Sequence, residues 1–115
     1  MSLEIQQRDN EGITVLEMKG RITVGKEATA LREKVAELAA ANVRNLVFNL
    51  REVDYIDSTG LGALVMCATT LRKAGGNVKL VNPASFVAKT FKMVGIISLF
   101  TVYESEADAV DACGG

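Results

Sequence analysis

The chain has 115 residues, a length typical of one domain, and 49% of them are hydrophobic, so we expect a single folded domain over residues 1–115. Its 13 basic and 14 acidic residues leave a net charge of −1, which gives no electrostatic basis for direct binding to nucleic acid or to a membrane. The absence of histidine excludes Ser-His-Asp triads and histidine-ligated metal sites.

The cysteines and the N-terminus favour the cytoplasm. Cys67 and Cys113 lie far apart and form no paired motif, which is typical of reduced thiols. The first residues have no basic stretch followed by an apolar core, as a signal peptide would. No apolar run approaches the roughly 20 residues of a membrane-spanning helix. We therefore expect a cytoplasmic protein with no membrane span.

The first part of the chain predicts a β-hairpin and a helix. Strands are predicted over residues 5–8 and 13–19, joined by the polar turn at residues 9–12. A helix is predicted over residues 26–41, with Thr23 as its candidate N-cap. The side chains at helical spacing are Ala28, Leu31, Val35, Leu38 and Ala39.

The middle of the chain predicts a buried strand and a second helix. Residues 45–50 form a short apolar run, as a central strand should. Residues 51–56 are interpreted as a connection, and a helix is predicted over residues 61–73. Its inward stripe would be Leu61, Leu64, Val65, Ala68 and Leu71.

The last part alternates in the same way. A strand is predicted at residues 78–81, a helix from Pro83 to Gly95, a strand at residues 99–103 and a final helix up to residue 112. The order β-β-α-β-α-β-α-β-α predicts an α/β fold with one mixed, mostly parallel sheet. The N-terminal hairpin would form its antiparallel edge, and about four α-helices would cover it.

Residues 57–62, Asp-Ser-Thr-Gly-Leu-Gly, place chemically distinctive groups where the second helix should begin. Unpaired backbone N–H groups and the helix dipole favour an anion such as phosphate at that point. Asp57 or Ser58 can cap the helix. Gly60 and Gly62 each cost roughly 1 kcal/mol relative to alanine in a helix. Close access for another protein and tight packing against the sheet are both open explanations for the two glycines.

Two catalytic interpretations of this motif fail. Val65 stands where the third glycine of a dinucleotide-binding fingerprint belongs. Ile56 occupies the leading glycine position of a hydrolase nucleophile elbow, and no histidine can activate Ser58. We therefore expect no enzyme activity and no bound metal.

The motif and the strand before it resemble the STAS domain of bacterial anti-sigma factor antagonists, and the resemblance covers nearly the whole chain. It implies that the unphosphorylated protein binds an anti-sigma factor, an ATP-dependent serine kinase, and so releases a sigma factor. The kinase would phosphorylate Ser58, with Thr59 as a second candidate acceptor. A metal-dependent serine phosphatase would reverse the modification. The ATP would belong to the kinase, so the chain itself would need no cofactor.

The partner-binding residues expected from this resemblance cluster around the motif. Many relatives carry an acidic residue in the loop after the second strand, whereas residues 20–23 have none, which leaves the identity of the kinase open. Met66 is either an adaptable partner contact or an ordinary exposed apolar residue. The full set is Asp57, Ser58, Thr59, Gly60, Gly62, Thr23 and Met66.

Three other roles stay open at this point. A STAS domain can serve as an accessory subunit of a lipid-transport complex or as a scaffold of a signalling assembly, and a fold does not determine function. The third is an enzyme or a small-molecule-binding domain, with a nucleotide as the ligand at the helix start. A monomer is expected, because no surplus apolar face is evident.

Overall fold

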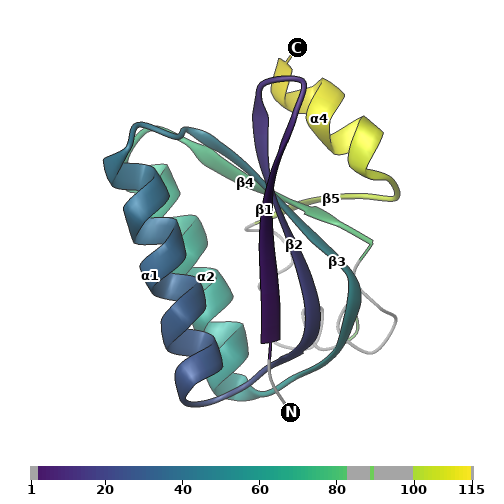
Figure 1. Ribbon diagram of the computed structural model, residues 1–115. Helices are drawn as coiled ribbons and strands as arrows, with labels where there is room; N and C mark the ends of the chain where they lie inside the picture. Colours follow the sequence, from purple (N-terminus) through teal and green to yellow (C-terminus); the bar gives the residue numbers. More distant parts are fainter. Residues whose placement is uncertain (1–2, 83–88, 90–99, 115) are drawn as a thin grey trace.

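A five-stranded sheet forms the centre of the molecule, with helices on both faces (Figure 1). The computed structural model describes residues 3–82, residue 89 and residues 100–114. The strands lie in the order β1-β2-β3-β4-β5. The elements are β1 (Leu3–Asn10), β2 (Ile13–Ile22), α1 (Lys26–Ala40), β3 (Asn45–Ile56), α2 (Ser58–Lys73), β4 (Asn77–Val81), β5 (Thr101–Tyr103) and α4 (Glu106–Gly114).

The predicted sheet is confirmed. β1 and β2 pair antiparallel around a tight turn in which Glu11 and Gly12 have φ values of 52° and 85°. Two positive φ values in succession are typical of hairpin turns that match the twist of the strands. The β2–β3, β3–β4 and β4–β5 pairs are all parallel. Of the predicted helices, the one from Pro83 to Gly95 lies outside the described residues except for residue 89.

Both faces of the sheet are covered. α1 and α2 lie side by side over one face, and α4 covers part of the other (Figure 1). Leu16 and Met18 of β2 belong to the larger core, under α1 and α2, while Val15 belongs to the smaller core. This arrangement explains why apolar and polar residues do not alternate cleanly along β2. The smaller core consists of Val15, Val47, Val81, Ala109 and Val110.

β3 is longer than its apolar run suggested. Residues 51–56, interpreted above as a connection, continue the strand and pair with the second half of β2. The ladder shifts register between Glu17 and Lys19 and again between Gly20 and Arg21. Because of this extension the two parallel strands end together, at Ile22 and Ile56.

The start of α1 also differs from the prediction. The N-cap is Gly25, with φ at 103° and no side-chain hydrogen bond, so Thr23 is not the cap. The Thr23 hydroxyl lies 3.5 Å from a carboxylate oxygen of Glu27, and its carbonyl accepts a hydrogen bond from Ala28 N–H. A glycine is needed here because the backbone adopts a conformation that side chains disfavour.

A polar cluster fastens α4 to the sheet. The Glu106 carboxylate accepts hydrogen bonds from Arg8 at 2.6 and 3.0 Å, from Asn10 at 2.7 Å and from the buried Asn49 at 3.1 Å. These donors, Arg8 foremost, lower the pKa of Glu106 to about 2. The first turn of α4 is thereby tied to β1 and β3. In the part of the chain that the structure describes, no helix has both the length and the apolar character to span a membrane.

Candidate functional site

The site lies where β2 and β3 end. Asp57 N–H donates to the Ile22 carbonyl at 3.2 Å, which continues the pairing of the two strands by one more bond. Residues 23–25, leading into α1, are therefore placed against the first turn of α2. The motif at residues 57–62 and the loop after the second strand meet at this edge of the sheet.

Asp57 holds the two segments together. It is the N-cap of α2, where one oxygen (Oδ1) accepts from Gly60 N–H at 2.7 Å. The other oxygen (Oδ2) accepts from Val24 N–H at 2.9 Å. The backbone bonds from Gly60 and Val24 lower the pKa of Asp57, so the group is charged at neutral pH. Of the two candidate caps, Asp57 is the N-cap, and its carboxylate joins the first turn of α2 to the loop at Val24.

Ser58 and Thr59 are the first two residues of α2, and both are exposed. Their hydroxyl groups are accessible, unlike the Asp57 carboxylate, whose two oxygens are engaged. A negative charge added at the start of a helix is favoured by the helix dipole, while the Gly60 N–H of this first turn already donates to Asp57. The site can therefore carry a phosphate without disrupting α2.

The two glycines of the motif have different surroundings. A Cβ atom on Gly60 would overlap the carbonyl oxygen of Ile22, so Gly60 is required for α2 to pack against the end of β2. A Cβ on Gly62 would meet no atom within 4 Å, and Gly62 is exposed. Tight packing therefore explains Gly60 alone. Gly62 leaves an open patch of backbone near the exposed hydroxyl groups.

Two surface features next to the motif were not foreseen. Val24, whose N–H donates to Asp57, is 64% exposed. An apolar residue next to Thr23 was visible in the sequence, but its exposure beside the motif was not predicted. The guanidinium of Arg21 lies 5.5 Å from the centre of the Tyr55 ring, within the range of a cation–π contact. Arg21 and Ile22, expected in the loop after the second strand, belong to β2 instead, and Thr23, which follows, is half-buried.

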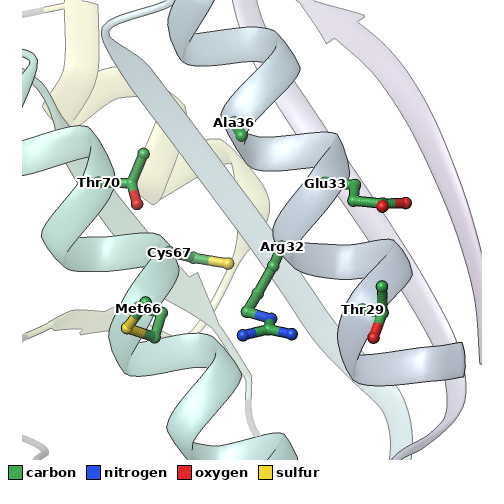
Figure 2. Close-up of a pocket in the computed structure, with 7 residues that line it drawn as sticks. All are labelled: Thr29, Arg32, Glu33, Ala36, Met66, Cys67 and Thr70. Carbon is green, nitrogen blue, oxygen red and sulfur yellow. The ribbon is translucent and has the colours of Figure 1, made fainter. Parts of the chain in front are cut away.

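A groove lies between α1 and α2 (Figure 2). One cavity of about 330 Å³ is lined by residues of both helices, and a second of about 290 Å³ shares Arg32 and Met66 with it. Thr59 and Gly62 line the second cavity, so the groove begins at the motif. The lining residues of the first are Thr29, Arg32, Glu33, Ala36, Met66, Cys67 and Thr70.

The sides of α2 differ from the predicted stripe. Met66 is 52% exposed, which agrees with its position outside that stripe, while its role in partner binding stays a prediction. Cys67, also left outside the stripe, is buried, and burial raises the pKa of its thiol to about 12. Val65, placed in the stripe, is only half-buried. The difference arises because α2 packs against α1 as well as the sheet, which turns its buried face toward both. The described residues contain no group of three cysteine, aspartate or glutamate side chains that could hold a metal ion.

Comparison with known proteins assigns the fold to a family. The model of the STAS domain matches residues 4–109. The chain belongs to the STAS domain family. It is 31% identical over 102 residues to the anti-sigma-B factor antagonist of Bacillus subtilis, a match that covers 89% of this chain and 92% of the relative. It is 30% identical over 116 residues to the anti-sigma-F factor antagonist RsfB of Mycobacterium tuberculosis, covering 99% and 92%.

Solved structures agree with this assignment. The anti-sigma factor antagonist SpoIIAA in its unphosphorylated form superposes with a TM-score of 0.77 at 19% identity, over 97% of this chain and 99% of that one. The phosphorylated form of Bacillus SpoIIAA gives a TM-score of 0.75 at 19% identity, over 96% and 99% of the two chains. At these identities the likeness shows that the STAS domains share a fold.

Proposed function

We propose that this chain is an anti-sigma factor antagonist that acts in the cytoplasm and is switched off by phosphorylation of Ser58. In its unphosphorylated form it binds an anti-sigma factor, which then releases its sigma factor for transcription. The family, and relatives with this role that are 30–31% identical over most of both chains, support the proposal. The observation that carries it is the exposed Ser58 at the start of α2, near the open backbone of Gly62.

The anti-sigma factor is a serine kinase in this scheme. It transfers the γ-phosphoryl group of ATP to the Ser58 hydroxyl, and ADP leaves. The phosphate brings about −1.5 to −2 charges, which the start of α2 tolerates. The neighbouring Asp57 carboxylate adds to the negative potential. A partner surface shaped for a neutral hydroxyl would have to desolvate that charge, so the complex dissociates while the fold stays intact. A serine phosphatase restores the hydroxyl.

The proposed site contains residues that contact the partner and residues that hold those contacts in place. Ser58, Thr59, Gly62 and Met66 are exposed and form the contact surface. Thr59, in the same turn, is the second candidate acceptor of phosphate. Asp57, Gly60 and Thr23 take part indirectly, since Asp57 and Gly60 fix the first turn of α2 and Thr23 belongs to the loop that Asp57 holds.

Binding of charge variants tests this proposal. We would purify the anti-sigma factor serine kinases encoded in the source genome and measure their affinity for the chain by calorimetry. Ser58→Ala should bind and should not become phosphorylated on this residue. Ser58→Asp should bind at least about tenfold more weakly, because its carboxylate must be desolvated.

A matched control separates position from charge. Thr69→Asp puts the same charge on an exposed residue of the same helix, away from the motif. It should bind as the unmodified chain does. Equal binding by Ser58→Asp and the unmodified chain would contradict the switch.

A lipid-transport subunit or a signalling scaffold would use the same fold. No feature of the described residues favours either role over sigma factor regulation. If the purified kinases fail to bind the unmodified chain, these alternatives become the leading proposals.

A further inference from the structure

The groove between α1 and α2 is lined by the exposed Arg32, by Glu33 and by a mixture of apolar and threonine side chains. The Arg32 side chain lies between the two helices, toward Met66 and Cys67, whereas Glu33 points away from α2 (Figure 2). Within the part of the chain that the structure describes, Arg32 has no hydrogen bond or ion pair. Its positive charge acts to lower the pKa of the Cys67 thiol, but the effect of burial is larger. That thiol is neutral at physiological pH because burial raises its pKa. Apolar side chains on the groove are Ala28, Ala36, Ala63, Met66 and Cys67.

A guanidinium that has no partner among the described residues and lies beside apolar side chains is complementary to a carboxylate next to an apolar group. Arginine holds a carboxylate through two parallel hydrogen bonds, which give direction as well as energy. Met66, 52% exposed and flexible, can adapt to the shape of an apolar side chain. The groove therefore fits a protein segment that presents an acidic and an apolar side chain together.

The location of the groove indicates which protein supplies that segment. Thr59 and Gly62 line its near end, and they belong to the turn that carries Ser58. A partner that covers Ser58 can therefore also contact Arg32 and Met66, because they line the same cavity as Thr59 and Gly62. We propose that the groove between α1 and α2 docks a segment of the anti-sigma factor with an acidic and an apolar side chain, and that Arg32 pairs with the acid.

This inference rests on the proposed function and adds the recognition element to it. Phosphorylation of Ser58 determines when the partner binds. Arg32 lies on α1, outside the motif, and its charge does not change with phosphorylation. Arg32 and Met66 would therefore determine which kinase is accepted, a property that residues 20–23 leave open.

Affinity measurements with matched variants test the docking contact. The probes are the purified serine kinases used above, and the variants are Arg32→Gln, Arg32→Lys and Lys34→Gln. Arg32→Gln should weaken binding at least about tenfold, since a charge-assisted pair is lost. Arg32→Lys should keep part of the affinity through its charge. Lys34→Gln removes the same charge from the same helix at a residue that does not line the groove, and should bind normally.

A cross-link identifies the segment directly. Met66→Cys is combined with Cys113→Ser, so that a photoreactive label attaches at position 66 while Cys67 stays buried. The label should react with a kinase peptide that contains aspartate or glutamate. Reversing the charge of that acid should weaken binding to the unmodified chain and restore binding to Arg32→Glu.

Three other results would overturn the docking inference, and they differ in what they mean for the proposed function. If Arg32→Gln binds like the unmodified chain while Ser58→Asp does not bind, the groove is not a docking site and the proposed function stands. If no kinase binds the unmodified chain, the proposed function fails and the docking inference falls with it. If ATP alone binds the isolated chain in an Arg32-dependent way, the groove is a nucleotide site and the inference is wrong.

Discussion

At the scale of single residues, Asp57 connects two parts of the site with its two carboxylate oxygens. Asp57→Ala removes the acceptors for Gly60 N–H and Val24 N–H. The free energy of unfolding should fall by about 1–2 kcal/mol, as it does when a helix cap is lost. Urea denaturation measures this change. Hydrogen exchange at the Val24 amide should become faster, because the loop is no longer held.

A neighbouring carboxylate provides the control for this prediction. Asp54 lies on β3, shortly before Asp57, is exposed and has no hydrogen bond or ion pair within the described residues. Asp54→Ala should change the free energy of unfolding by no more than about 0.5 kcal/mol. Similar losses for both variants would show that Asp57 has no special part in joining the loop to α2.

The two glycines of the motif predict opposite effects of one substitution. Gly60→Ala places a methyl group against the Ile22 carbonyl and should destabilise the fold by at least about 2 kcal/mol. Gly62→Ala meets open space and should stabilise α2 by up to about 1 kcal/mol, because alanine is the better helix former. Thermal and urea unfolding distinguish the two. Gly62→Ala should nevertheless bind the kinase more weakly, and a variant that is more stable and binds equally well would remove Gly62 from the partner surface.

At the scale of elements, α4 is held by a charged pair that responds to pH. The pKa of Glu106 is lowered to about 2, so its interactions stabilise the fold above its ordinary pKa, near 4.5. This contribution should decline as the pH falls from about 5 toward 2, where the carboxylate becomes protonated. The free energy of unfolding, followed by urea denaturation across this range, should fall more steeply for the unmodified chain than for Glu106→Gln.

The same variant should lose stability at neutral pH. Glu106→Gln weakens the bonds from Arg8, Asn10 and the buried Asn49, and hydrogen bonds to charged groups contribute about 1.5–3 kcal/mol each. Glu104→Gln, an exposed glutamate beside the same helix, is the control. A steep acid dependence that persists in Glu106→Gln would assign the effect to other carboxylates.

Much of the element pattern could be predicted because local signals agree with the fold. The turn at Gly12 and the helical spacing of Leu31, Val35 and Leu38 correctly indicated the hairpin and α1. The second half of β3 could not be predicted in the same way. Its polar residues Glu52 and Asp54 are disfavoured in strands, and only pairing with β2 makes the extended conformation stable.

The site was predictable in its residues and less so in its geometry. The identity of Ser58 and its place at a helix start follow from the sequence, whereas the bond from Val24 to Asp57 depends on two strands ending together. The same holds for Gly60, whose necessity comes from the Ile22 carbonyl, far away in sequence. The sequence pattern places Arg32 on the outer face of its helix, and it is exposed. Its place beside a groove could not be predicted, because the neighbouring helix α2 forms the other wall.

At the scale of the whole molecule, the buried thiol reports the integrity of the core. Cys67 is 1% exposed and its pKa is raised to about 12, so it should react with a thiol reagent only when the fold opens. In a Cys113→Ser variant, the labelling rate of Cys67 should rise steeply with urea and be negligible in its absence. Rapid labelling without denaturant would mean that α1 and α2 separate readily.

The most direct test of the switch is the affinity of the Ser58-phosphorylated chain for its kinase, relative to that of the unphosphorylated chain, by calorimetry. Because the phosphate must be desolvated in the complex while the helix start tolerates it, phosphorylation should lower the affinity by at least about 100-fold. The urea unfolding curve should be nearly unchanged. Equal affinity of the two forms, or a kinase that leaves Ser58 unmodified, would contradict the account.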